Sequence, residues 1–226
     1  MHALLFDTET TGTTHPQLIE AAWLELDSPT SLSIIQQFEQ RYRPDHKISL
    51  GALATHHIYD EELQNCPSHS TFRLPAETQY LIGHNVDYDW QVIGSPEGVK
   101  RICTLALARR YLPGLDSHSQ SALIYHLDRT NARERLRAAH SALADVQNCL
   151  VLLQALIQRI NTEHQPTLAT WEELWRYSER ARIPEIMPFG KHRGMPIADL
   201  PSDYKAWLLR QDGLDPYVKM AVQANF

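Results

Sequence analysis

Apolar residues in the first part of the chain come in short runs bounded by turn residues, and this pattern predicts strands. An opening apolar run reaches Thr8, and two further runs follow at residues 18–27 and 32–43. Ser28 and Pro29 separate the second run from the third, and residues of this kind form the turns between neighbouring strands. We therefore expect three consecutive strands that form an antiparallel meander.

Farther along the chain the apolar spacing changes from strand-like to helical. Short strands are expected at residues 80–85 and 101–104, and helices at 105–112, 121–127 and 141–160. The last of these is the longest periodic segment, and its apolar residues cover enough of the helix to pack against a sheet. Together these elements predict an α/β fold with a mixed five-stranded sheet flanked by helices.

The apolar periodicity stops near residue 161, which indicates a domain boundary. Residues 162–170 have the composition of a linker, so we expect one domain over residues 1–161. Residues 171–226 are expected to form a small α+β module. Its predicted elements are one helix, a hairpin-like stretch with the sequence MPFGKHRGMPI, and two more short helices.

Composition and charge exclude several classes of protein. The 43% apolar content supports a folded core, and the three cysteines are far apart and form no CxxC pair. This cysteine pattern argues for a reducing compartment, against a disulfide framework and against a zinc knuckle. With neither a signal-like N-terminus nor a long apolar run, we expect a cytoplasmic protein without membrane contact. The net charge of −6 means that any anionic partner must be held by local groups.

Two acids, Asp7 and Glu9, end the opening apolar run. Residues two apart in a strand point to the same face, so their carboxylates project together and raise each other's pKa. A cation between them would remove this repulsion, and oxygen ligands suit Mg²⁺ or Mn²⁺. Taken alone, however, this pattern is more commonly explained by two solvated acids at an exposed strand end.

Further acids and a histidine follow at intervals. Asp89 lies just after the expected strand at residues 80–85, and Asp87 is a rival for the same role. His140 precedes Asp145 by five residues, at the start of the longest predicted helix. Asp145 would then lie about one turn into that helix, with His140 at its mouth. By itself, His140 would be interpreted as a capping or surface histidine.

In combination these residues resemble a known family. Asp7 and Glu9 in DTETTG, Asp89 in HNVDYD, and His140 with Asp145 in HSALAD resemble the three exonuclease motifs of the DnaQ-like superfamily, in the DEDDh subtype. The resemblance covers roughly the first 160 residues and implies a ribonuclease H-like fold. It also favours Asp89 over its rival, because the family's acid follows an aromatic or apolar residue.

The resemblance implies a metal-dependent 3′→5′ exonuclease that releases nucleoside 5′-monophosphates. Two Mg²⁺ or Mn²⁺ ions would be bound by the four acids, with Asp7 as the expected bridge between them. His140 would act as the general base that takes a proton from the attacking water, because histidine titrates close to neutral pH.

Residues around the first motif are predicted to contact the substrate. Backbone N–H groups near Thr10 and Thr11 would meet the terminal 3′-hydroxyl, and Gly12 lets the chain turn there. His56 matches a family histidine near the substrate, although a structural role is equally well supported. The side-chain amide of Asn85 is expected to hold the turn before the second motif.

Charged residues near the other motifs have two interpretations each. Arg135 and Arg137 either attract phosphate groups or form a solvated basic loop, and their closeness to His140 favours the first interpretation. Glu20, in LIEAAW, matches an acid of the family's second strand and is expected to be structural.

The C-terminal residues carry a second resemblance. The Phe-Gly-Lys-x-x-Gly pattern and the DLPxxYxxWL stretch are similar to the small domain that follows the nuclease domain in exodeoxyribonuclease X-like proteins. Lys191 and Arg193, in a glycine-flanked turn, are predicted to contact a nucleic-acid backbone. Tyr204 and Trp207 share one helical face, and we expect them to form a miniature core.

The sequence as a whole predicts an enzyme that degrades DNA from 3′ ends. One alternative is an RNA exonuclease similar to oligoribonuclease or ribonuclease T. The other is a catalytically silent nucleic-acid-binding protein on the same fold. The appended module favours DNA, and the five filled motif positions favour an enzyme. The oligomeric state, the strand preference and the pathway are left open.

Overall fold

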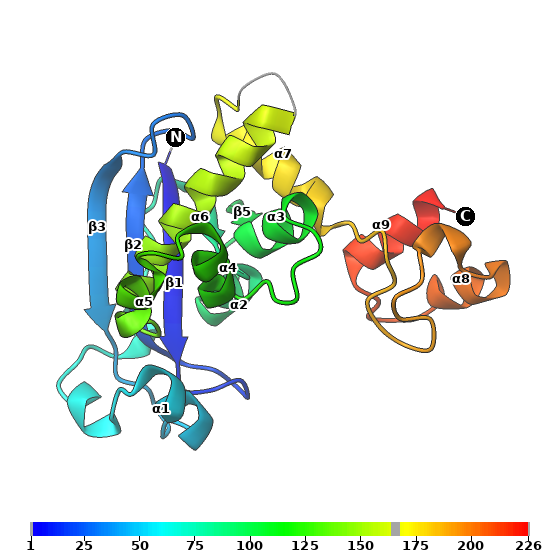
Figure 1. Cartoon of the computed structure of the whole chain (residues 1–226). Coiled ribbons are helices and arrows are strands. Elements are labelled where there is room, and N and C mark those ends of the chain that lie inside the picture. The colour runs from blue at the N-terminus through cyan, green and yellow to red at the C-terminus, as the bar shows by residue number, and fades with distance from the viewer. Residues whose placement is uncertain (1, 164–167, 226) are drawn as a thin grey trace. The chain divides into compact units, whose positions relative to one another are not determined.

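The computed structural model describes residues 2–163 and 168–225. Two compact units make up the chain, Met1–Ser178 and Glu179–Phe226. Figure 1 shows the strands and most of the helices in the first unit and the last two labelled helices in the second.

A five-stranded sheet forms the centre of the first unit. Its strand order is β3-β2-β1-β4-β5. The strands span His2–Thr10 (β1), Leu18–Leu26 (β2), Ile34–Arg41 (β3), Thr78–Gly83 (β4) and Lys100–Cys103 (β5). Strand β1 pairs antiparallel with β2 and parallel with β4, while β2–β3 is antiparallel and β4–β5 is parallel. The predicted meander and mixed sheet are therefore confirmed.

The sequences of the strands explain their places in the sheet. Strand β2 is buried along all nine residues, as its almost unbroken apolar run requires, although it includes Glu20 and Glu25. Strand β1 is also apolar until Asp7 and Glu9, which are half-buried. Strand β3 is rich in glutamine and largely exposed, which suits an edge strand. The core therefore lies around β1, β2 and β4.

Helices cover the sheet and occupy the connections after the meander. They span Leu50–His56 (α1), Asp87–Val92 (α2), Thr104–Tyr111 (α3), Gln120–Leu127 (α4), Ala132–Arg135 (α5), Ala142–Glu163 (α6) and Trp171–Arg182 (α7). Helix α6 packs on β1 and β2, and α3 and α4 pack on α6 (Figure 1). No helix of the described residues has both the length and the apolar character needed to cross a membrane.

The predicted linker and the start of the module differ from the structure. Helix α6 continues to Glu163, into the predicted linker, whose residues 164–167 lie outside the described residues. Helix α7 begins where the module was expected to begin, yet its residues up to Ser178 belong to the first unit. The reason is packing: Trp171 and Leu174 are buried, and Ser178 Oγ accepts the Cys103 N–H at 2.8 Å. The units therefore divide after Ser178.

The second unit is a small helical module. It holds a short 3₁₀ turn at Ile197–Asp199 and two helices, Ser202–Leu208 (α8) and Pro216–Ala224 (α9). The expected hairpin-like stretch is held by a single antiparallel bridge between Ile186 and Pro196 rather than by full strands. A compact apolar cluster forms its core: Met187, Ile197, Leu200, Tyr204, Leu208, Val218, Ala221 and Val222.

Strand β4 ends against β1 in a contact that leaves no room for a side chain. A Cβ atom added to Gly83 would lie 2.8 Å from the Phe6 carbonyl oxygen and 3.2 Å from Val86 Cβ. Since both neighbours belong to the packed interior, neither can move away cheaply. This glycine therefore sets the place where the chain leaves the sheet and enters α2.

We expect Gly83→Ala to lower the free energy of unfolding by about 1–3 kcal/mol, because the added methyl group overpacks the interior. Urea denaturation measures the change. Gly51→Ala is the matched control: Gly51 lies in α1 with nothing within 4 Å of an added Cβ. The control should be neutral or stabilising by about 1 kcal/mol at most. Equal effects of the two substitutions would contradict the close packing of Gly83.

Candidate active site

Three carboxylates converge at the end of the central strand. Asp7 and Glu9 project from β1, and Asp145 lies in the first turn of α6. One carboxylate oxygen of each residue lies within 4.8 Å of the others, and all three residues are half-buried. The packing of α6 on β1 thus brings together acids that are far apart in sequence.

Asp89 joins this group from α2. Its side chain is buried, and its Oδ1 accepts hydrogen bonds from the Thr8 N–H (3.0 Å) and the Thr8 hydroxyl (2.6 Å). These bonds tie the second motif to β1 between the two acids of the first. Asp87, the rival in the sequence, instead accepts from Arg101 Nη1 at 2.6 Å. The structure therefore places Asp89, and not Asp87, beside the carboxylates of β1.

The acids of this cluster hold their protons strongly. Burial and the charges of Asp89, Asp145, Glu9 and Glu20 raise the pKa of Asp7 well above its ordinary value. Burial and neighbouring acids raise the pKa of Glu9 to about 8, while burial is the main cause that raises the pKa of Asp89 to about 7. A divalent cation would relieve this repulsion, and the purely oxygen donor set suits Mg²⁺ or Mn²⁺.

His140 lies in the turn that leads into α6. Its backbone N–H donates to Asp145 Oδ2 at 3.0 Å, and Gln120 Nε2 donates to Asp145 Oδ1 at 3.2 Å. The φ angle of His140 is +69°, in the left-handed region that few residues other than glycine adopt. Its side chain is exposed. The Asp145 carboxylate thus holds the strained turn from which the imidazole faces solvent.

Glu20 anchors the start of α6. It pairs with Glu9 across the β1–β2 ladder, and its buried carboxylate accepts from the Ala142 N–H at 2.9 Å. Its other oxygen accepts from Arg41 Nε at 2.9 Å. Ala142 begins α6, where backbone N–H groups lack partners within the helix. The expected structural role of Glu20 is therefore to fix the helix that carries Asp145.

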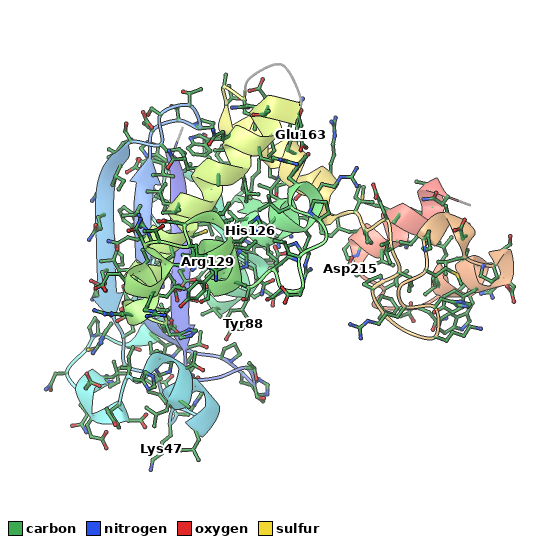
Figure 2. The ribbon with its side chains drawn as sticks, in the orientation of Figure 1. Lys47, Tyr88, His126, Arg129, Glu163 and Asp215 are labelled. Atoms are coloured by element: carbon green, nitrogen blue, oxygen red, sulfur yellow. The ribbon has the colours of Figure 1, made fainter. Side chains whose placement is uncertain are left out.

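The loop after β1 is held by contacts that the sequence did not indicate. The Tyr88 hydroxyl, labelled in Figure 2, lies 2.7 Å from Thr10 Oγ1 and donates to the Gly12 carbonyl at 3.1 Å. Gly12 has φ +148°, and an added Cβ would lie 2.7 Å from Ser49 Oγ. The expectation for Thr11 was wrong: its N–H donates to the Gln17 carbonyl at 3.0 Å and is not available to a 3′-hydroxyl.

Two further predicted residues are engaged within the fold. His56 is buried at the end of α1, where its Nδ1 accepts from the Ile58 N–H at 3.0 Å, and burial lowers its pKa. These contacts engage Nδ1 alone: within the described residues the buried Nε2 of His56 has no hydrogen-bond partner, so a contact of this histidine with substrate stays a prediction beside the structural alternative. Asn85 adopts φ +70°, and its carbonyl accepts the Tyr88 N–H. Within the described residues its side-chain amide makes no hydrogen bond, so the turn depends on the Asn85 backbone and not on its amide as expected.

The predicted basic contacts differ in their surroundings. Arg135 pairs with Asp128 at 3.0 Å, and Arg137 pairs with Glu134 at 2.8 Å, so part of their charge is neutralised locally. Lys191 and Arg193 are exposed in the second unit. Contact of any of these residues with substrate remains a prediction.

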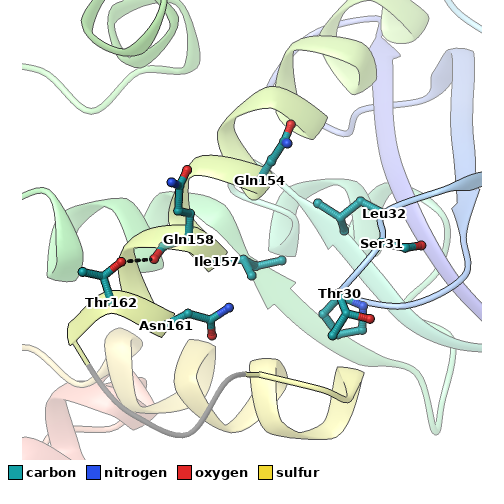
Figure 3. Close-up of a pocket in the computed structure, with 9 residues that line it drawn as sticks. Thr30, Ser31, Leu32, Gln154, Ile157, Gln158, Asn161 and Thr162 are labelled. Carbon is teal, nitrogen blue, oxygen red and sulfur yellow. Dashed lines mark hydrogen bonds between the residues drawn. The ribbon is translucent and has the colours of Figure 1, made fainter.

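A pocket of about 530 Å³ lies elsewhere on the first unit (Figure 3). It is formed by the turn between β2 and β3, including Thr30 and Leu32, and by the C-terminal part of α6, including Ile157. That turn follows Leu26, which pairs with Ala3 at the start of β1. The pocket is therefore at the end of β1 opposite to the carboxylates and is not part of their site.

The chain is similar in sequence to known exonucleases. A family model described as exonuclease matches residues 4–153, about two thirds of the chain. A second model, described as "Putative quorum-sensing-regulated virulence factor", matches residues 181–220. Exodeoxyribonuclease 10 of Escherichia coli (strain K12) is 26% identical over 227 residues, which cover 97% of this chain and 96% of the relative.

Solved nuclease structures share the fold. Exonuclease X in complex with 5′ overhanging duplex DNA matches with a TM-score of 0.55 and 21% identity, over 78% of this chain and 99% of that chain. The nuclease domain of 3′hExo, a DEDDh family member bound to rAMP, matches with a TM-score of 0.54 and 14% identity, over 70% and 92% of the two chains.

The fold is that of ribonuclease H-like nucleases, and the acid cluster lies on its central strand. The chain belongs to the exonuclease family, whose model matches about two thirds of its residues. Enzymes of this family depend on divalent metal, a requirement that the carboxylate cluster fits.

We expect the metal-free protein to lose stability as the pH rises from about 4.5 to about 8. Glu9 has a pKa of about 8 in the folded protein, against an ordinary value of 4.5. Between these values the native state binds more protons than the unfolded state, so raising the pH favours unfolding. Thermal unfolding in EDTA at pH 5 and pH 8 measures the loss.

Glu9→Gln should reduce this difference between the two melting temperatures, because glutamine does not titrate. Glu39→Gln, which changes an exposed acid on β3, should leave it unchanged. Addition of Mg²⁺ at pH 8 should raise the melting temperature of the wild-type protein. A wild-type melting temperature that does not fall between pH 5 and pH 8 would contradict the raised pKa.

Proposed function

We propose that this exonuclease hydrolyses DNA from the 3′ end and releases nucleoside 5′-monophosphates. The observation that carries the proposal is the convergence of the Asp7, Glu9 and Asp145 carboxylates at the end of β1. Asp89 lies beside them and His140 lies in the turn before α6. Similarity to Exodeoxyribonuclease 10 over nearly the full length of both chains supports DNA as the substrate.

The proposed cofactors are two Mg²⁺ or Mn²⁺ ions, which Asp7, Glu9, Asp89 and Asp145 would bind. When bound, such ions clamp the scissile phosphate and stabilise charge on the entering and leaving oxygens. The protein itself keeps the four carboxylates close together although their negative charges repel one another. It also keeps Asp145 oriented through Gln120.

His140 is proposed to be the general base. Its exposed imidazole takes a proton from the attacking water, whose oxygen forms a bond to phosphorus. The bond from phosphorus to the 3′-oxygen of the preceding nucleotide breaks, and that oxygen takes a proton from solvent.

The 3′-terminal nucleotide is proposed to lie against the loop formed by Thr10, Thr11 and Gly12. This loop follows the first motif directly; the Tyr88 hydroxyl donates to the Gly12 carbonyl, and the Ser49 N–H donates to the Thr11 carbonyl at 2.8 Å. With the Thr11 N–H already used, recognition of the terminal hydroxyl falls to other groups of the loop.

An assay with DNA and RNA of matched sequence, labelled at the 5′ or the 3′ end, tests the proposal. With Mg²⁺ or Mn²⁺ we expect 3′-labelled DNA to release labelled mononucleotide at once. The 5′-labelled DNA should shorten stepwise from the other end, and EDTA should stop both. Asp7→Ala should abolish release while the protein remains folded, because it removes the central acid of the cluster.

Each other outcome of this assay has a defined meaning. Faster degradation of RNA would overturn the DNA assignment and favour the ribonuclease alternative. Binding without release under any metal condition would identify a silent binding protein. Full activity of Asp7→Ala would contradict the assignment of the metal ligands.

We expect His140→Ala to lower kcat by about 10²–10⁴-fold, the usual cost of losing a general base. Single-turnover measurements on 3′-labelled DNA give the value. The matched control is His126→Ala, because His126 is an exposed histidine on α4 (Figure 2) and should leave kcat unchanged. If His140→Ala kept a kcat within about threefold of wild type, the proton would have to leave by another route.

A further inference from the structure

One surface of the second unit places an exposed tryptophan beside a basic turn. We call it the Trp207 surface and define it as Lys191, Arg193, Tyr204 and Trp207. Trp207 is 46% exposed and lies outside the apolar core of the unit, whereas Tyr204 belongs to that core. The expectation that both aromatic residues form a miniature core was therefore correct for Tyr204 and wrong for Trp207.

The basic turn packs directly on Tyr204. It closes through a hydrogen bond from the Arg193 N–H to the Gly190 carbonyl at 3.1 Å. Gly190 has φ +71°, and an added Cβ would lie 3.0 Å from the Tyr204 hydroxyl. Lys191 is the next residue of the turn, and its Nζ lies 5.1 Å from the centre of the Tyr204 ring. The turn thus fixes a cation on the aromatic cluster.

Tyr204 in turn supports Trp207. Their rings stack with centroids 5.3 Å apart and an interplanar angle of 24°, and His192 packs edge-on against Tyr204 at 4.5 Å. Because Tyr204 covers one face of the indole and the side chain is still half exposed, the other face is open to a ligand. The result is a rigid aromatic platform with an open face and a neighbouring positive charge.

The charge around this platform suits a polyanion. Residues 179–226 contain seven Lys and Arg against six Asp and Glu, whereas residues 1–178 contain fourteen against twenty-one. Lys191 and Arg193 are exposed and form no ion pair within the described residues. Lys191 therefore lies against the ring that stacks on Trp207, and Arg193 follows two residues later in the same turn, in the part of the chain that is not acidic overall.

We propose that the Trp207 surface binds single-stranded nucleic acid. A base stacks on the open face of Trp207, and backbone phosphates contact Lys191 and Arg193, which is how proteins hold single strands without reading their sequence. The proposal goes beyond hydrolysis and does not rest on it, because this binding needs neither the carboxylates nor metal.

Binding is tested with the full chain carrying Asp7→Asn, in EDTA, so that hydrolysis does not interfere. Fluorescence anisotropy of a labelled oligothymidylate gives Kd. Trp207→Ala should raise Kd about 5- to 150-fold, the usual loss when one base-stacking side chain is removed. Met220→Ala is the control, because Met220 is a 49% exposed apolar residue on α9 and should leave Kd unchanged.

The salt dependence of Kd tests the cations separately. Lys191→Ala and Arg193→Ala should each lower the slope of log Kd against log salt by about 0.7, the contribution of one phosphate contact on a single strand. Lys219→Ala, on α9, should not change the slope. Melting curves of all variants should match the parent, because the replaced side chains are exposed.

Three results would overturn the proposal. The first is an unchanged Kd for Trp207→Ala. The second is equal affinity for oligothymidylate and for an abasic strand of the same length, since the latter has no base to stack. The third is binding to phosphatidylserine vesicles that depends on Trp207 while oligonucleotide binding does not. Failure of the nuclease assay alone would leave these measurements interpretable, because they need no hydrolysis.

Discussion

Repulsion among carboxylates at one end of β1 is the constraint that organises the first unit. Two acids come from the strand, and Asp89 and Asp145 approach from two helices. The hydrogen bonds that Asp89 and Asp145 accept come from uncharged donors: the Thr8 hydroxyl, the Gln120 amide and the backbone N–H groups of Thr8 and His140. The protein therefore orients these acids without neutralising them, and the missing positive charge has to come from a bound cation.

The rest of the fold keeps this unfavourable arrangement from moving apart. Glu20 lies opposite Glu9 but is neutralised by Arg41, so this fifth acid serves as an anchor and not as a ligand. Its bond to the Ala142 N–H fixes the start of α6 on β2. The close packing of Gly83 against the Phe6 carbonyl fixes the end of β4 on β1. Geometry that repulsion would open is thus held by packing and by the ion pair between Glu20 and Arg41.

Much of this arrangement was predictable from the sequence, because its signals are local. Short apolar runs predicted all five strands, and the order of the acids with His140 identified the family. The bond between Glu20 and Ala142 joins residues 122 positions apart, so no local signal could show it. The boundary after Ser178 was not predicted, because it depends on a hydrogen bond from Cys103, which is distant in sequence. That the Thr11 N–H is already used was not predicted either, because its acceptor, the Gln17 carbonyl, is brought to it by the fold. Trp207 shares a helical face with Tyr204, and only tertiary packing reveals that one is buried and the other open.

The Asp145 carboxylate belongs to the cluster that could hold a cation, and it also accepts the hydrogen bond from the His140 N–H. The bond from Oδ2 to the His140 N–H holds a turn whose φ of +69° is unfavourable for histidine. Any change in the charge or orientation of this carboxylate therefore alters the free energy of that turn. Cation affinity and the placement of the histidine are consequently linked quantities, and by reciprocity each must influence the other. A substitution at residue 140 that removes the strain of the positive φ, such as glycine, would therefore be expected to change the affinity of the site for its cation, although that residue supplies no ligand.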